Sequence, residues 1–169
     1  MRKLFILRTC IDFAFYISCL TVLVMTIFIP IAILGFADGI PFKIQAREIV
    51  IENWQSKLLL VFVLTSSLFF VYSIYLLRKT VTLFIKGDVF NEQVISNFRS
   101  IGFCIISSTL LFVIPSFIYN AIDSGEVGLS FDLGFDSPLL VISLGLFFMV
   151  LSEVFQKAKN LKEENDLTL

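Results

Sequence analysis

The segment from Ser100 to Ile122 reads SIGFCIISSTLLFVIPSFIYNAI and contains no charged residue. An α-helix rises about 1.5 Å per residue, so roughly 20 apolar residues cross the hydrocarbon layer of a bilayer. This segment is therefore long enough to span a membrane as one helix. Its central Ser107, Ser108 and Thr109 are small hydroxyl residues, which allow helices to approach closely and to hydrogen-bond to each other or to their own backbone.

Three further segments are free of charge, namely Phe13–Ala37, Leu58–Leu77 and Ser137–Ser152. The last is short, but it continues through Val154 and Phe155 if Glu153 extends its carboxylate toward the headgroups. We therefore expect four transmembrane helices. Their predicted ranges are 11–36, 58–80, 98–121 and 138–157.

The composition of the whole chain agrees with this expectation. Of its 169 residues, 57% are apolar and 16% are charged, whereas roughly 25% of an ordinary soluble domain is charged. Lipid must therefore solvate much of the surface. We expect a single all-α integral membrane domain over residues 1–169.

Lysine and arginine predict the orientation of the helices, because cytoplasmic connections carry an excess of them. Ten of the thirteen lie before the first span, between the second and third, or after the fourth: Arg2, Lys3, Arg8, Arg78, Lys79, Lys86, Arg99, Lys157, Lys159 and Lys162. Both termini should then be cytoplasmic, together with a turn over residues 81–97 and a tail over 158–169. Residues 37–57 and 122–137 become outer loops.

The outer loops resemble strands in their pattern. The second one alternates with a period of two, placing Val127, Leu129, Phe131, Leu133 and Phe135 on one face, which is typical of a strand. The first loop has a weaker pattern of the same kind. We expect the two loops to pair as a small extracellular β-cap.

Helix boundaries are marked by local chemistry. Ser137-Pro138 is typical of an N-cap followed by proline in the first helical position. Gly87 should end the second helix in the left-handed conformation, and Asn91 should cap the third. Superposing the chain on itself pairs Pro30 with Pro115, and the halves read as two helical hairpins from a tandem duplication.

Several functions are disfavoured by what the sequence lacks. Histidine is absent, which removes the commonest general base and imidazole metal sites. Cys10, Cys19 and Cys104 lie in apolar stretches and indicate small buried residues. A net charge of −1 does not favour direct contact with nucleic acid. We therefore expect no enzyme, no metal and no cofactor.

Two charged residues come closest to the membrane, Asp12 and Glu153. An acid at that position is a functional candidate, either as a proton or cation site in a wet vestibule or as one half of an ion pair. Near the cytoplasmic boundary, ion pairs with Arg8, Arg78 or Arg99 are the simpler interpretation.

Two cytosolic patches carry a family resemblance. The residues are Gly87–Glu92, Phe98–Gly102, Ser152–Phe155 and Glu163–Leu169. They are similar to the bacterial membrane-protein family catalogued as domain of unknown function 2975, with Asn91 where the family tends to have threonine or serine. The resemblance implies a four-helix protein of the plasma membrane, often encoded beside a small helix-turn-helix regulator. It implies no activity.

These observations favour a non-enzymatic multi-pass protein that regulates or recruits a cytosolic partner, such as a small helix-turn-helix regulator. The predicted partner surface consists of Gly87, Asp88, Phe90, Asn91, Glu163, Glu164, Asp166 and Leu167. Helical extensions with apolar stripes support it: Val81 and Phe84 after the second span, and Val154, Ala158 and Leu161 after the fourth. The stripes could instead pack together or lie on the lipid surface. The alternative function is a transporter, lipid-binding protein or channel subunit, which requires a homo-oligomer.

Overall fold

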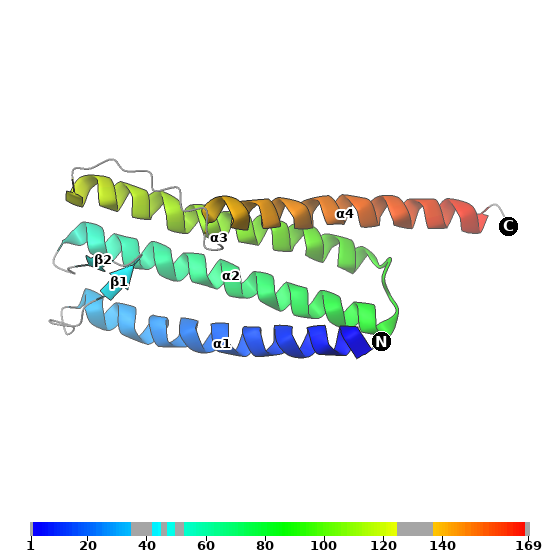
Figure 1. Ribbon diagram of the computed structural model, residues 1–169, viewed down its shortest axis with the longest axis horizontal. Helices are drawn as coiled ribbons and strands as arrows, with labels where there is room; N and C mark the ends of the chain where they lie inside the picture. The colour runs from blue at the N-terminus through cyan, green and yellow to red at the C-terminus, as the bar shows by residue number, and fades with distance from the viewer. Residues whose placement is uncertain (1, 35–41, 45–46, 50–52, 125–136, 168–169) are drawn as a thin grey trace.

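The computed structural model consists of four long α-helices and one short β-hairpin, and describes residues 2–34, 42–44, 47–49, 53–124 and 137–167 (Figure 1). The helices are α1 (Arg2–Ile33), α2 (Trp54–Lys86), α3 (Glu92–Ser124) and α4 (Pro138–Leu167), and the strands are β1 (Phe42–Ile44) and β2 (Arg47–Ile49). All four helices are long and apolar enough to cross a membrane. The prediction of four helices long and apolar enough to span a membrane is thus confirmed.

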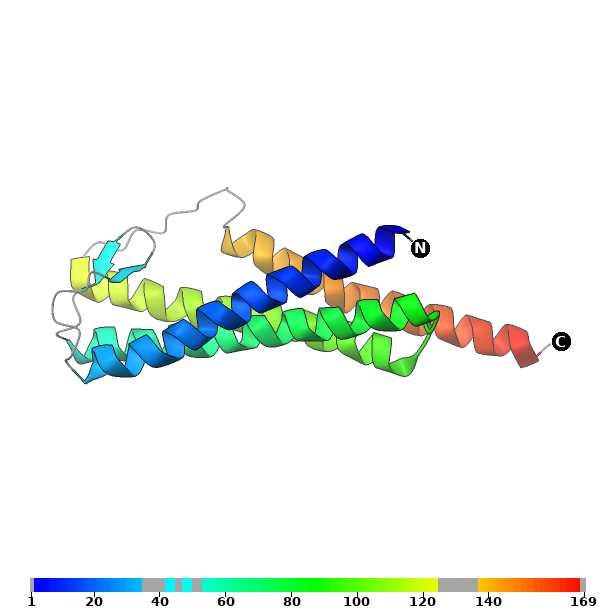
Figure 2. The ribbon, with the colours of Figure 1, turned by 90° about the horizontal axis from the view of Figure 1, so that it is seen from below.

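The helices pack in chain order, α1 on α2, α2 on α3 and α3 on α4 (Figure 1). We call the end that carries β1 and β2 the hairpin end, and the end where α2 meets α3 the turn end. The helix α4 begins partway along α3 and continues past the turn, as both ribbon views show (Figures 1 and 2). The two helical pairs, α1 with α2 and α3 with α4, therefore differ in how far one helix is shifted along the other (Figures 1 and 2).

Gly87 ends α2 as expected. Its φ of 88° lies in the left-handed region, and its N–H donates to the carbonyl of Phe84 at 3.2 Å. The N–H of Asp88 donates to Leu83 at 3.2 Å, which completes a glycine C-cap that satisfies carbonyls at the end of the helix. This cap turns the chain toward α3.

The beginnings of α3 and α4 also follow the prediction. The side-chain oxygen Oδ1 of Asn91 accepts a hydrogen bond from the N–H of Gln93 at 2.9 Å, so Asn91 is the N-cap of α3. Pro138 is the first residue of α4, and the carbonyl of Ser137 accepts the first helical hydrogen bond from Leu140 at 3.0 Å.

The predicted β-cap is not supported. Strand pairing in the described residues is confined to the first connection, where β1 and β2 run antiparallel with Phe42 opposite Ile49 and Ile44 opposite Arg47. The alternating segment of the second connection lies in 125–136, outside the described residues. A tight hairpin forms within one loop because its partners are adjacent in sequence, so little chain entropy is lost in closing it.

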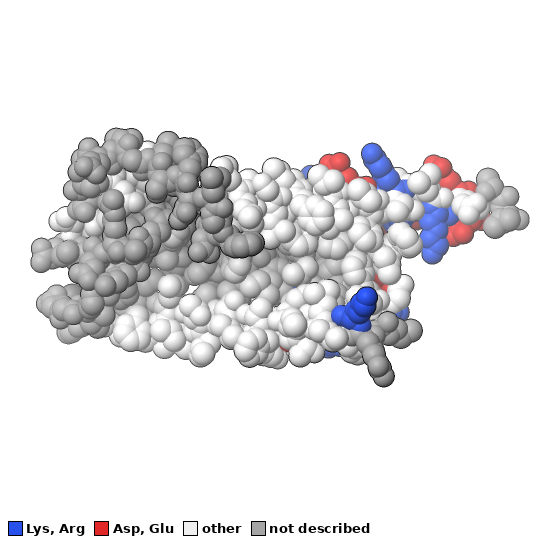
Figure 3. All heavy atoms as spheres, viewed as in Figure 1, with Lys and Arg blue, Asp and Glu red and all other residues white. Residues whose placement is uncertain are grey.

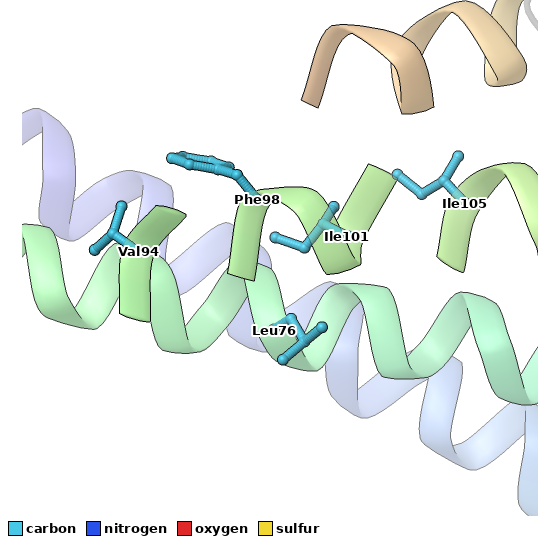
Figure 4. Packing of buried hydrophobic residues seen from close by; sticks show 5 residues of the cluster. All are labelled: Leu76, Val94, Phe98, Ile101 and Ile105. Atoms are coloured by element: carbon cyan, nitrogen blue, oxygen red, sulfur yellow. The ribbon is translucent and has the colours of Figure 1, made fainter. Parts of the chain in front are cut away.

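The main core lies at the turn end, where α2, α3 and α4 meet. Its buried residues come from α2 and α3 (Figure 4): Leu76, Val94, Phe98, Ile101 and Ile105. The helix α4 contributes Phe148, Leu151 and Phe155, and the rings of Phe98 and Phe155 lie 5.4 Å apart.

The end of α4 meets the bundle through Phe155, whereas Val154 and Leu161 of the predicted apolar stripe are exposed. Val154 and Leu161 are 53% and 66% exposed, and Phe155 packs on α2 and α3 in their place, with its ring stacked on that of Phe84 at 5.8 Å. Neighbouring residues of a helix point about 100° apart. Because both faces of α4 are apolar, hydrophobicity could not identify the one that meets the bundle.

The helices α3 and α4 approach most closely at two glycines. A Cβ atom on Gly102 would lie 2.5 Å from the carbonyl oxygen of Gly145, and one on Gly145 would lie 2.7 Å from Cγ1 of Ile106. Small residues allow such backbone contact between membrane helices. The crossing therefore depends on the absence of side chains there.

Serine hydroxyl groups also join neighbouring helices by hydrogen bonds to backbone carbonyls. The Ser66 hydroxyl donates to the carbonyl of Ser108 at 2.9 Å, joining α2 and α3 at mid-span. The Ser152 hydroxyl donates to the carbonyl of Ile95 at 2.8 Å, joining α4 to α3. These bonds agree with a packing role for the mid-span hydroxyl residues.

The helix α1 lies at one side of the bundle and packs mainly on α2 (Figure 1). It packs on α2 through Ile29 and Ala32, which contact Leu60. Cys104 on α3 is buried as expected, but Cys10 on α1 is exposed, contrary to prediction. An apolar neighbourhood in the sequence does not distinguish burial in protein from contact with lipid.

Candidate functional site

Asp12 forms an ion pair that fastens α1 to α2. Its carboxylate lies 2.6 Å from Nε of Arg78 and 3.8 Å from Nε of Arg8. The Arg78 guanidinium also lies over the rings of Phe15 and Tyr16, at 5.5 and 5.6 Å from their centroids. The ion pair predicted for Asp12 is confirmed, and the carboxylate has a structural role at the turn end.

Glu153 lies in a different setting. It is exposed and lines a pocket of about 530 Å³ between α3 and α4, together with Glu92, Ser96, Arg99 and Gln156. We call this the turn-end pocket. Among the residues that the structure describes, Glu153 makes no ion pair with Arg8, Arg78 or Arg99, although its side chain and that of Arg99 line the same pocket.

The turn between α2 and α3 rests on α4. The ring of Phe90 lies 6.5 Å from that of Phe155, and the ammonium of Lys162 lies 5.7 Å from the Phe90 ring. Nζ of Lys159 meets the carboxylate of Glu92 at 2.7 Å. Aromatic packing, a cation–π contact and an ion pair thus brace the turn against α4.

The tail of the chain is helical as far as Leu167. Glu163, Glu164 and Asp166 are exposed on the last turns of α4. Glu163 lies 3.5 Å from Lys159, whereas the side chain of Leu167 lies outside the described residues.

The predicted partner surface therefore has two parts, the turn between α2 and α3 and the acidic residues at the end of α4. The contacts among described residues join the turn to Phe155, Lys159 and Lys162, and the acids of the tail follow these residues along α4. Gly87 and Asp88 are exposed at the turn. We call residues 157–167 the α4 extension.

Charge is segregated along the molecule. On the face shown in Figure 3, charged side chains gather at the turn end and on the α4 extension, and the middle of the bundle is uncharged among the described residues. No group of three His, Cys, Asp or Glu side chains within the described ranges could hold a metal ion.

Sequence reasoning missed the turn-end pocket as a unit. Its walls come from α3 and α4, which are far apart in the chain, and only their packing brings Ser96 and Arg99 opposite Ser152 and Gln156. The spacing of Ser152, Glu153 and Gln156 places polar groups together at the end of the fourth span. This clustering of polar residues was the only sign of the turn-end pocket in the sequence.

Comparison with known proteins gives one result for the chain. The model of a family described as "Protein of unknown function (DUF2975)" matches residues 15–169. No curated protein and no solved structure matches. The matched range contains the turn, the turn-end pocket and the α4 extension.

Proposed function

Because the chain belongs to the DUF2975 family of proteins of unknown function, we propose its role from its own geometry. It is a multi-pass protein of the bacterial plasma membrane that recruits or regulates a cytosolic protein at its turn end. The proposal does not invoke catalysis, since the chain contains no histidine and Asp12 is engaged by Arg78.

The distribution of basic residues supports a cytoplasmic turn end. Arg8, Arg78, Lys86 and Arg99 all belong to helix segments at that end, and Lys157 follows on α4. Positive residues are retained on the cytoplasmic side during insertion. The amino terminus and the α4 extension then both face the cytoplasm.

The α4 extension is the observation that carries the proposal. It remains helical to Leu167 and continues past the turn, outside the packed bundle (Figure 2). Lys159 is drawn toward Glu92, and the side chains exposed on the last turns include the acids Glu163, Glu164 and Asp166. A helix held firmly at its base suits the docking of a partner, because little conformational freedom is lost on binding.

The chemistry of this surface favours a partner with a basic face. Glu163, Glu164 and Asp166 present carboxylates beside the exposed apolar side chain of Leu161. A small helix-turn-helix regulator has such a basic face where it contacts DNA. Docking there would compete with DNA and hold the regulator at the membrane.

Site-specific photocrosslinking in intact cells tests the proposal. A photoreactive phenylalanine analogue replaces Leu161, which is 66% exposed, and in a matched control it replaces Ile6, which is 64% exposed at the same end of the bundle. A discrete protein adduct from position 161 alone, lost on reversing the charges of Glu163, Glu164 and Asp166 to lysine, supports docking. Equal adducts from both positions, or none from either, would overturn it.

A second function, as an oligomeric transporter or channel subunit, draws support from the turn-end pocket. Glu153 and Arg99 line this pocket between α3 and α4, where ions or polar solutes could enter. It predicts flux through reconstituted liposomes that falls at least tenfold in Glu153→Gln. Absence of flux in every oligomeric state would exclude it.

A further inference from the structure

A groove runs between α2 and α3 toward the hairpin end. Its volume is about 580 Å³, and its walls are almost entirely apolar, with Phe62 and Phe69 from α2 and Phe103, Leu110 and Ile114 from α3. This groove is separate from the turn-end pocket, with which it shares no lining residue.

The groove lies on a face of α3 that α4 does not cover. Gly102 and Ile106 meet α4, whereas Phe103 and Ser107, each one residue later, line the groove. One residue corresponds to about 100° around a helix. The groove therefore opens toward the surroundings of the bundle, which in a membrane are lipid.

The groove is long enough for an extended hydrocarbon chain. On α2 it extends from Trp54 to Phe69, a distance of about 22 Å along the helix axis. A hydrocarbon chain fits, because contacting carbon atoms lie only about 4 Å apart.

Polar groups gather at one end of this apolar groove. Trp54, Gln55 and Tyr119 line it at the hairpin end, and the hydroxyl of Ser56 donates to that of Tyr119 at 3.3 Å. Tryptophan and tyrosine are enriched at membrane interfaces, where their rings lie at headgroup level. The groove thus has an apolar length and a hydrogen-bonding mouth, the same polarity as a phospholipid.

We infer that this groove binds one acyl chain of a membrane lipid. The chain lies against Phe62, Leu110 and Ile114, and the ester region of the lipid accepts hydrogen bonds from the indole of Trp54 and the amide of Gln55. The binding is independent of the partner surface at the opposite end of the bundle. Leu20 and Leu23 of α1 serve as the control for this binding. Both side chains are exposed and line neither the groove nor the turn-end pocket, so in a bilayer they should meet only bulk lipid.

Photolabelling in a bilayer tests the inference. The full chain is reconstituted in vesicles of phosphatidylethanolamine and phosphatidylglycerol that contain a few per cent of a phosphatidylglycerol with a diazirine at mid-chain, and labelled residues are mapped by mass spectrometry. We expect Leu110 and Ile114 to be labelled at least fivefold more than Leu20 and Leu23. Equal labelling of both sets, as contact with bulk lipid would give, or an unlabelled groove would overturn the inference.

Matched variants sharpen the test. Ser107→Leu fills the groove and should reduce its labelling to the level of α1, whereas Ser143→Leu makes the same change on an exposed face of α4 and should have no effect. Labelling that persists in Ser107→Leu, or falls equally in both variants, would count against the site.

A second readout uses wild-type protein, so it stands even if Ser107→Leu fails to fold. Trp54 is the only tryptophan and lies at the mouth of the groove. A phospholipid brominated near its ester should quench its fluorescence with saturation at a low mole fraction. Quenching that rises in simple proportion to bulk mole fraction would refute specific binding.

Discussion

Gly102→Ala should separate α3 from α4. The added Cβ would lie 2.5 Å from the carbonyl oxygen of Gly145 and 2.6 Å from Cγ of Met149. Since comfortable contacts begin near 3.5 Å, α4 would have to retreat by about 1 Å. A gap of that size forfeits roughly a quarter to a half of the dispersion energy of the surrounding contacts.

The net effect combines two terms of opposite sign. Overpacking against backbone costs about 2–3 kcal/mol, while alanine favours the helix over glycine by about 1 kcal/mol. We expect Gly102→Ala to lower the free energy of unfolding by about 1–2 kcal/mol. Gly145→Ala should destabilise the protein less, because the carbonyl oxygen of Gly102 lies 3.0 Å from its added Cβ, although Cγ1 of the β-branched Ile106 lies 2.7 Å away and must also shift.

The measurement is reversible unfolding of the protein in mixed micelles by increasing fractions of SDS, followed by circular dichroism. Gly145→Ala serves as the matched control, since it makes the same chemical change at the same helix crossing. A neutral or stabilising Gly102→Ala, or a Gly145→Ala that costs more, would refute the packing described for α3 and α4.

Substitutions at three other positions test the turn end, each by the same unfolding measurement. Asp12→Asn leaves Arg78 without its ion partner. The free energy of unfolding should fall by between the ~1 kcal/mol of an exposed pair and the ~3 kcal/mol of a buried one, because the side chains of Asp12 and Arg78 are 25% and 31% exposed. An unchanged stability would show that α1 is held by apolar contacts alone. Gly87→Ala should cost about 1 kcal/mol through its φ of 88°, since no atom lies within 4 Å of the added Cβ, and Gly87→Asn should cost less; equal costs would contradict a backbone origin. Asn97→Leu removes the 3.1 Å hydrogen bond to the buried hydroxyl of Thr80 and should lower the free energy of unfolding by about 1–3 kcal/mol. An Asn97→Leu variant as stable as wild type would show that this bond is dispensable.

The ends of the helices were predictable because their chemistry is local. Gly87, Asn91 and Pro138 each act through their own backbone or through neighbours within a few residues. The existence of four apolar helices was predictable for a similar reason, since each charge-free segment is long enough to be recognised by itself.

The contacts between helices were not predictable in the same way. In a bilayer both the packed and the lipid-facing sides of a helix are apolar, so Phe155 and Val154 are equivalent by composition although only Phe155 packs on Phe84. The meeting of Gly102 with Gly145 and the walls of both pockets arise from residues distant in sequence. Hydrophobicity carries no information about such pairings.

The short charge-free part of α4 has a consequence for the surrounding lipid. From Pro138 to Ser152 it measures about 22 Å, whereas the hydrocarbon of a typical bilayer is about 30 Å thick. The lipid beside α4 must thin, or the helix must draw its flanking polar groups inward, at a cost that grows with each ångström of mismatch. Thin membranes should therefore suit this protein best, and bilayer thickness should influence in which membrane it accumulates.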